Sequence, residues 1–251
     1  MLRPLAVLCL LLALRLPAAE VDQLLSQATE AESQLDSRRA LTLLLEAERL
    51  KPNDAKLLQK IARQYSDLVL DQPDREAKKR YAQTALDYSL RAVALDPRDP
   101  VNVLSLAVCH GKLAVYSDTR TKVQYSRLVK EEAERALALD PNYAWAHHVL
   151  GRWHYEVASL GAGARFFVRL FYGGLPEASY AQAIEHLTRA VALEPTELNH
   201  HLELGFACAA AGNAEEARRH WQHGLALASR GKHDEPAKAR AREALAAQTS
   251  D

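Results

Sequence analysis

The sequence predicts an all-α fold: a superhelical solenoid of about five helix pairs with a C-terminal capping helix. A phrase of Leu, one polar residue and Pro recurs four times, and each copy follows an Ala-rich amphipathic stretch and precedes another helical pattern. Only 6% of the residues are aromatic and β-branched runs are nearly absent, which favours helices over sheets. Internal repeats of this kind are typical of solenoids, in which stacked units share one continuous core. The prolines of the phrase are Pro52, Pro97, Pro141 and Pro195.

The spacing of these prolines predicts that the units differ in length. A proline ends one helix and is tolerated in the first turn of the next, so each phrase marks a boundary between units. Successive prolines are 45, 44 and 54 residues apart. Compared with a repeat of about 34 residues, the second, third and fourth units carry insertions of 11, 10 and 20 residues. We expect these insertions between the helices of a pair, and a capping helix with a polar outer face at residues 234–248.

The final unit has Leu204 and Gly205 in its first helix, Gly212 and Asn213 in the turn, and Ala217, Trp221 and Gly224 along its second helix. In these residues it resembles the tetratricopeptide repeat, which consists of two antiparallel helices. Small residues at fixed places let the paired helices approach closely, while Leu and Trp fill the groove between them. The resemblance implies a superhelical array with a concave inner face lined by the first helix of each pair.

Residues 1–19 are predicted to be a secretory signal peptide. They contain a basic start at Arg3, an apolar run from 5 to 14 and an exit of small residues at Ala18 and Ala19. A run of this length is too short to cross a bilayer, which takes about 20 residues. We therefore expect export to the periplasm or the outside, with residues 20–248 as the repeat domain. The alternative is that residues 1–19 remain as an uncleaved membrane anchor.

Charge and reactive residues argue for binding without catalysis. The chain has 32 basic and 32 acidic residues, so charge gives no case for a nucleic-acid partner. Cys109 and Cys208 fall in separate helix pairs and are predicted to be buried free thiols. The histidines lack the spacing of a zinc motif, and no Ser-His-Asp or Cys-His arrangement can be defended. No enzyme activity, metal or cofactor is therefore predicted.

The long fourth unit contains residues 150–158 (LGRWHYEVA), an Arg- and Phe-rich insertion and residues 175–184 (LPEASYAQAI). These segments resemble the regulator of microtubule dynamics family, and the similarity extends over roughly 50–225. It implies a non-catalytic helical repeat domain. Animal members associate with microtubules, and some are held on organelle membranes by an N-terminal hydrophobic segment. An exported chain would not meet tubulin, so we expect a microtubule role only for a cytosolic chain.

The concave face is predicted to bind a peptide or another protein. Arginine can hold a carboxylate in bidentate fashion beside aromatic surface, and both kinds of side chain are expected along the first helices. The alternative is that Arg152 faces solvent and that Trp153 and Tyr155 belong to the core. The groove candidates are Lys56 and Arg63 in the second unit and Trp145, His148, Arg152 and Tyr155 in the fourth.

The insertion at 160–175 gives a second candidate surface. On a helix, Phe167, Leu170 and Phe171 share one face, while Arg165 and Arg169 lie together on another. Such a helix could form one wall of an apolar cavity that binds a lipid, or it could lie on a membrane surface. The favoured interpretation is that it packs into the space opened by its own insertion.

Overall fold

The computed structural model describes the backbone of residues 3–248 and the side chains of residues 18–248. Within that part of the chain every regular element is helical, and no strand is present. The α-helices are α1 (Arg3–Ser33), α2 (Ser37–Leu50), α3 (Ala55–Asp67), α4 (Arg75–Leu95), α5 (Pro100–Val115), α6 (Thr119–Leu139), α7 (Ala144–Ala158), α8 (Ala162–Tyr172), α9 (Tyr180–Leu193), α10 (Leu198–Ala210), α11 (Ala214–Ala226) and α12 (Asp234–Gln248), with a 3-10 turn η1 (Val69–Asp71).

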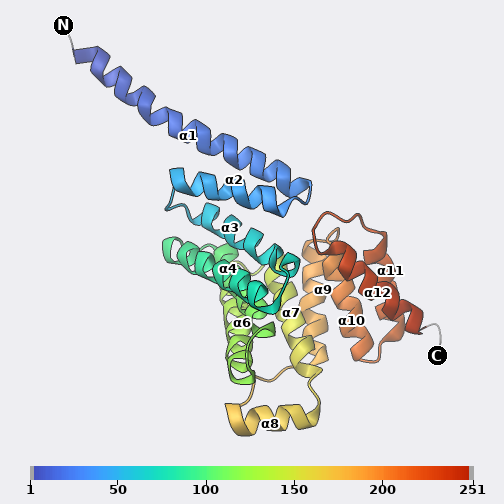
Figure 1. The fold of residues 1–251 in the computed structure, drawn as a ribbon. Helices are drawn as coiled ribbons and strands as arrows, with labels where there is room; N and C mark the ends of the chain where they lie inside the picture. The colour runs from blue at the N-terminus through green and yellow to red at the C-terminus, as the bar shows by residue number, and fades with distance from the viewer. Residues whose placement is uncertain (1–2, 249–251) are drawn as a thin grey trace.

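Ten of these helices form five antiparallel pairs: α1 with α2, α3 with α4, α5 with α6, α7 with α9, and α10 with α11. Each pair stacks on the next, and α12 closes the array against α10 and α11 (Figure 1). The first helices α3, α5, α7 and α10 contact one another in this order and form the inner layer. The predicted all-α solenoid of about five pairs with a capping helix is therefore confirmed.

The recurring proline phrase sets the start of each new pair. Helices α3, α5, α7 and α10 each begin three residues after the proline, so these prolines lie in the connection and not in the first turn. Short acidic side chains begin several helices. The carboxylates of Asp54 and Asp74 accept backbone N–H groups of Leu57 at 3.0 Å and Ala77 at 2.7 Å. Such caps satisfy donors that the first helical turn leaves unpaired.

Glycines allow the two helices of the last pairs to come close together. A Cβ added at Gly151 would lie 2.7 Å from Leu187 Cγ, and one added at Gly205 would overlap the indole of Trp221. Leu187 and Trp221 are both buried, so each fills the space that the missing glycine side chain leaves. The tetratricopeptide-like residues of the final unit therefore act as the sequence predicts.

The extra residues of the longer units form different structures in different units. In the second and third units they belong to longer second helices, because α4 and α6 each have 21 residues whereas α11 has 13. In the fourth unit they form the separate helix α8, which extends from the edge of the array (Figure 1). Cys109 and Cys208 are free and buried, as predicted.

The N-terminal prediction concerns residues that the structure largely leaves undescribed. Residues 1–2 lie outside the described backbone, and the side chains of residues 3–17 lie outside the described side chains. Among the described residues, no helix is both long and apolar enough to span a membrane. The signal peptide over residues 1–19 stays a prediction.

Candidate functional site

The inner face of the array carries exposed charge from α3 and α7. Lys56 and Arg63 are exposed on α3, and the Arg63 guanidinium lies 3.8 Å from the carboxylate of Asp67 at the end of the same helix. The side chain of Arg63 is 64% exposed, so most of its donors are free for a ligand. Arg152 is exposed on α7, one turn before the half-buried Tyr155. The structure thus presents these predicted residues along the inner layer.

Lys112 on α5 lies beside α3 on this face, although it is not among the residues that the sequence predicts. Its ammonium donates to the carbonyl of Ser66 at 2.7 Å. Burial lowers the pKa of Lys112, Asp67 opposes that shift, and Lys232 and Arg152 reinforce it. Lys112 therefore places a half-buried cation beside the end of α3 on the inner face.

The α11–α12 loop reaches across the array to the second unit. The ammonium of Lys232 lies 2.5 Å from the Asp71 carboxylate, and Nε2 of His233 lies 3.4 Å from the Asp67 carboxylate. Lys232 and Asp71 are 161 residues apart in the chain. These contacts bridge the inner face between its second unit and its C-terminal end.

Asp234 holds that loop in place. Its carboxylate accepts the backbone N–H groups of Arg230 at 2.7 Å and Gly231 at 2.6 Å, and it also accepts the side-chain amide of Asn199 at 2.9 Å. Because Asn199 is on α10, the loop is fixed to the last repeat before it extends toward the second one. The sequence signal for this loop is the polar segment 229–234 between two helical patterns.

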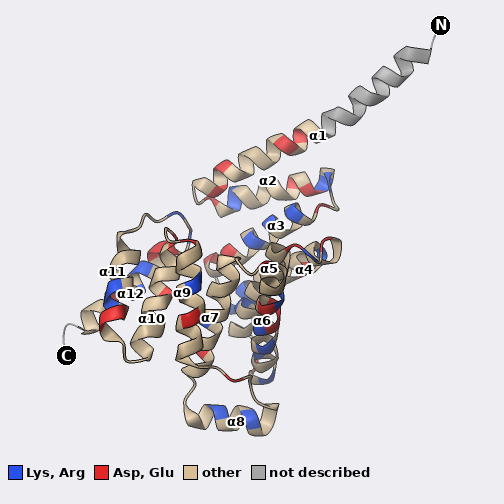
Figure 2. Cartoon of the chain, turned by 180° about the vertical axis from the view of Figure 1, so that it is seen from behind, with Lys and Arg blue, Asp and Glu red and all other residues tan. Residues whose placement is uncertain are grey.

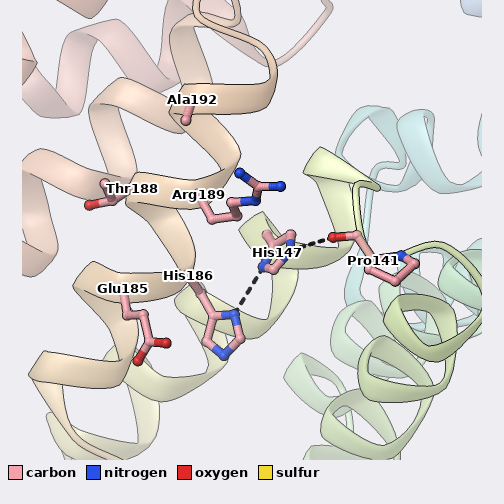
Figure 3. Close-up of a pocket in the computed structure, with 7 residues that line it drawn as sticks. All are labelled: Pro141, His147, Glu185, His186, Thr188, Arg189 and Ala192. Carbon is pink, nitrogen blue, oxygen red and sulfur yellow. Dashed lines mark hydrogen bonds between the residues drawn. The ribbon is translucent and has the colours of Figure 1, made fainter.

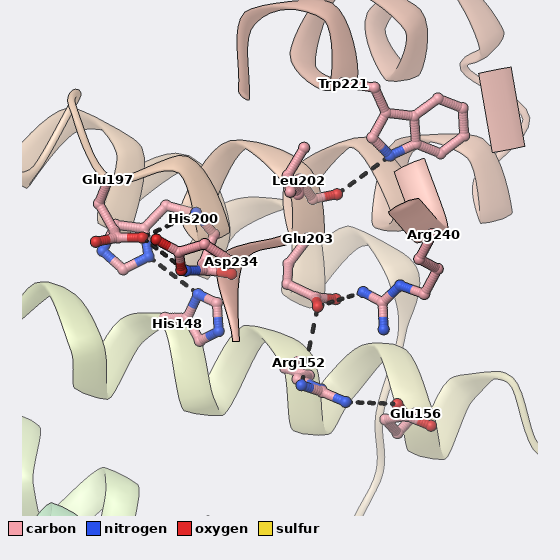
Figure 4. A network of polar contacts seen from close by, with 11 residues as sticks. His148, Arg152, Glu156, Glu197, His200, Leu202, Glu203, Trp221, Asp234 and Arg240 are labelled. Carbon is pink, nitrogen blue, oxygen red and sulfur yellow. Dashed lines mark hydrogen bonds and ion pairs between the residues drawn. The ribbon is translucent and has the colours of Figure 1, made fainter. Parts of the chain in front are cut away.

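A buried carboxylate ties the fourth unit to the capping helix (Figure 4). Glu203 on α10 is 8% exposed and forms ion pairs with Arg152 of α7, at 3.8 Å, and with Arg240 of α12. Arg152 also lies 3.7 Å from Glu156. Arg152 is therefore already paired with carboxylates, and a ligand that used it would compete with them. The sequence does not single out Glu203 or Arg240, since nothing local marks their contact.

His148 lies in a different environment from the one predicted. Its ring is buried, and its Nδ1 lies 3.0 Å from Nδ1 of His200 on α10, so one of the two nitrogens donates to the other. Burial lowers the pKa of each ring to about 3. The ring of Trp145 lies against His200 with 4.8 Å between ring centroids. His148 therefore joins α7 to α10 and does not face a ligand, and Trp145 also takes part in this joint.

A second histidine pair recurs in equivalent places of the last two units. Nδ1 of His147 lies 3.0 Å from Nδ1 of His186, and Nδ1 of His201 lies 3.3 Å from Nδ1 of His220. Nε2 of His147 lies 3.1 Å from the Pro141 carbonyl, and Nε2 of His201 lies 3.0 Å from the carbonyl of the equivalent Pro195. Because a carbonyl only accepts, these Nε2 atoms carry the proton in the neutral rings, and their Nδ1 atoms accept from the partner rings.

An open hollow of about 520 Å³ lies beside the first of these pairs (Figure 3). It is on the side of α7 and α9 that adjoins the α6–α7 connection, and Arg189 crosses to the Asn142 amide oxygen at 2.6 Å. Among the described residues, no group of three or more His, Cys, Asp or Glu side chains is arranged to hold a metal ion. The hollow is lined by Pro141, His147, Glu185, His186, Thr188, Arg189 and Ala192.

The predicted packing of the Phe-rich insertion is wrong. Helix α8 has no buried residue, and it lies against the array only through α6. Its connection to the body is made by its backbone, because the Arg127 guanidinium donates to the carbonyls of Tyr172 and Gly174. The insertion extends outward and opens no space to fill. All five candidates of this surface are therefore exposed: Arg165, Phe167, Arg169, Leu170 and Phe171.

Stacked antiparallel helix pairs of this kind define a tetratricopeptide-type helical solenoid. TTC0263, a thermophilic tetratricopeptide protein of Thermus thermophilus, has the same fold, with a TM-score of 0.67 and 20% identity over 90% of this chain and 98% of its own. The chain belongs to the family whose model is described as regulator of microtubule dynamics protein 1-3, which matches residues 18–249.

The chain is also similar in sequence to individual members of this family. The chain is 29% identical over 174 residues to regulator of microtubule dynamics protein 3 of Xenopus laevis. It is 25% identical over 187 residues to regulator of microtubule dynamics protein 1 of Mus musculus. These matches cover 69% and 74% of this chain but only 36% and 61% of the relatives. The chain therefore corresponds to part of each relative's length.

Proposed function

We propose that the protein is a non-catalytic scaffold whose inner face binds an extended segment of another protein. The observation that carries this proposal is the charged inner face, where Arg63 of α3 is exposed, Lys112 of α5 donates to α3, and the α11–α12 loop reaches the second unit. Tetratricopeptide arrays use such faces because a stack of first helices offers a long surface of regularly spaced side chains.

The charges on this face favour a segment with acidic groups near its α3 end. Arg63 is largely free and can hold a carboxylate in bidentate geometry. Lys56 adds a second exposed cation about two turns earlier on the same helix. Near α7 the balance changes, since Arg152 is held by Glu203 and Glu156. We therefore expect Arg63 to contribute more to partner binding than Arg152.

The test is capture of partners from the native host by the tagged protein, compared across single variants. Arg63→Ala is expected to weaken capture about tenfold, as for one charge-assisted contact, and Arg152→Ala less. Arg218→Ala is the matched control, because Arg218 is also exposed but lies on the second helix α11. Unchanged capture by both Arg63→Ala and Arg152→Ala would sink the groove assignment.

We also propose that the chain is exported by residues 1–19, with the mature protein starting near Ala19 or Glu20. The support is the basic start, short apolar run and small-residue exit of this segment. The relatives' names point to microtubules, and that role is proposed only for a chain that stays in the cytosol. The intact mass of protein from its own host is the measurement: a full-length mass would contradict cleavage and favour the anchored alternative.

The structure does not support the alternative in which the insertion at 160–175 binds a lipid in a cavity. That alternative needs Phe167, Leu170 and Phe171 to form the wall of an apolar cavity. Their exposed fractions are 47%, 62% and 59%, so they face solvent. The exposed apolar side chains of α8 are instead available for contact with a partner of the protein.

A further inference from the structure

Helix α8 concentrates large apolar side chains at the surface. Phe166, Phe167, Leu170 and Phe171 are 68%, 47%, 62% and 59% exposed, and they fall within six consecutive residues. The other exposed large apolar residues of the described chain are spread over α2, α4, α5, α6, the α1–α2 connection and η1. On a helix these four positions cover one continuous face. Clustered exposure of this kind marks an interaction surface, whereas scattered apolar residues do not.

The fold does not need these side chains. The Arg127 guanidinium holds α8 through the carbonyls of Tyr172 and Gly174, at the C-terminal end of the helix. Gly173 and Gly174 have φ of 76° and 81°, the left-handed conformation that ends a helix and turns the chain back. Val168 and Tyr172, on the opposite side of the helix, are half-buried. The phenyl rings therefore point outward from a helix whose position is set by other groups.

Basic residues predominate around α8, although the exposed Asp118 at the start of α6 and Glu177 after α8 are acidic. No acidic residue occurs from 157 to 176, while Arg165 and Arg169 lie at one edge of the apolar face. The adjoining first turns of α6 add the exposed Arg120 and Lys122. Figure 2 shows basic residues on α8 and on the neighbouring end of α6, with no acidic residue on α8. An occupant of this surface must combine apolar and negatively charged groups.

We propose that α8 docks the protein on the surface of a membrane that contains anionic phospholipid. The Phe and Leu side chains enter the boundary between headgroups and acyl chains, and Arg165 and Arg169 lie at the level of the phosphates. The helix protrudes from the array (Figure 1), a shape that suits a deformable lipid surface better than a protein pocket. This inference does not depend on the groove.

The geometry disfavours two other occupants. A second copy of α8 placed face to face would bring Arg165 and Arg169 of both copies together, which costs electrostatic repulsion. A stable protein interface buries about 800 Å² on each partner, more than one face of an 11-residue helix offers. A lipid surface needs neither a matching pocket nor that area, because apolar insertion and charge attraction add up.

The test is co-sedimentation of the full chain with vesicles of phosphatidylcholine alone and of phosphatidylcholine mixed with phosphatidylglycerol. We expect binding to the mixed vesicles, and about tenfold weaker partitioning for Leu170→Ser, as for one buried leucine lost. The matched control is Leu70→Ser, because Leu70 in η1 is 60% exposed and Leu170 is 62% exposed. The double variant Arg165→Glu/Arg169→Glu should lose the preference for phosphatidylglycerol.

Several outcomes would overturn the proposal. One is failure of the wild-type chain to bind the mixed vesicles. Another is equal binding by Leu170→Ser and Leu70→Ser, which would assign any membrane affinity to another segment. A photo-crosslinker at position 167 that captures one protein and no lipid in host membranes would make α8 a protein-docking helix instead. Because all substituted side chains are exposed, circular dichroism should confirm an unchanged fold for every variant.

Discussion

The paired helices of the fourth and fifth units pack through equivalent contacts, although the connections between the helices differ greatly. In both, a glycine of the first helix faces a bulky residue of the second, Gly151 against Leu187 and Gly205 against Trp221. In both, the histidine four residues before that glycine bonds a proline carbonyl and a histidine of the second helix. The two pairs therefore share apolar and polar contacts at equivalent positions.

The connections between the paired helices differ in length. In the fifth unit residues 211–213 join α10 to α11, whereas in the fourth unit residues 159–179 join α7 to α9 and include α8. The two helix pairs pack in the same way despite the different connections, because the facing helix surfaces fix the packing. Long insertions at a surface connection cost little free energy, since loop-closure entropy grows slowly with length. The insertion is thus free to carry a function of its own.

Removing the bulky residue of either pair is expected to have the largest effect on stability. Trp221→Ala should lower the free energy of unfolding by about 4 kcal/mol and Leu187→Ala by about 3 kcal/mol, because each leaves a buried cavity. Urea unfolding followed by circular dichroism measures both. A small loss in one unit alone would break the equivalence of the two pairs.

Acid should weaken the joint between these two units. A histidine of an unfolded chain has a pKa of about 6.5, and burial lowers the pKa of His148 and of His200 to about 3 in the folded protein. The unfolded state therefore binds more protons as pH falls below about 6.5, so stability is full above that pH and declines toward pH 3. Between pH 7 and pH 5 each ring should contribute a loss of about 2 kcal/mol.

Urea midpoints at the two pH values test this loss. His148→Gln/His200→Gln should be less stable at pH 7 but should depend less on pH. His223→Gln is the control, because His223 is exposed on α11. An unchanged pH dependence in the double variant would mean that this pair does not set the acid sensitivity of the joint.

Exchanging the connections should have a smaller effect. Replacing residues 159–179 by the Ala-Gly-Asn turn of residues 211–213 removes α8 and the hydrogen bonds of Arg127. We expect a loss of about 1 kcal/mol, as for one or two partly exposed hydrogen bonds. Thermal unfolding of the exchanged protein and of the wild type measures this loss of unfolding free energy. A loss as large as that of Leu187→Ala would show that α8 supports the pair after all.

The smallest expected effect concerns the loop that follows the fifth unit and has no counterpart after the fourth. Lys232→Ala should cost about 0.5 kcal/mol, because the ion pair with Asp71 is partly solvated. A double-mutant cycle with Asp71→Asn isolates the pairwise contribution. Additive effects of the two substitutions would show that the contact across the inner face contributes no stability.

The sequence by itself determined the repeat and its register. The proline phrase placed the first helices, since α3, α5, α7 and α10 all begin three residues after it. The glycine and tryptophan of the last unit predicted its close helix packing, and the absence of β-branched runs predicted the helical class. These features are local, or recur at a fixed spacing, so the order of residues along the chain is enough to reveal them.

Only the tertiary structure decided which side chains are free and which are already bound. Arg152 looked open but is paired with Glu203 of α10, and His148 is buried against His200. Helix α8 looked like core, yet it has no buried residue. Each outcome depends on a partner, or the lack of one, in helices that are distant in the chain. Burial and pairing follow from the superhelical path of the whole array, which no single unit specifies.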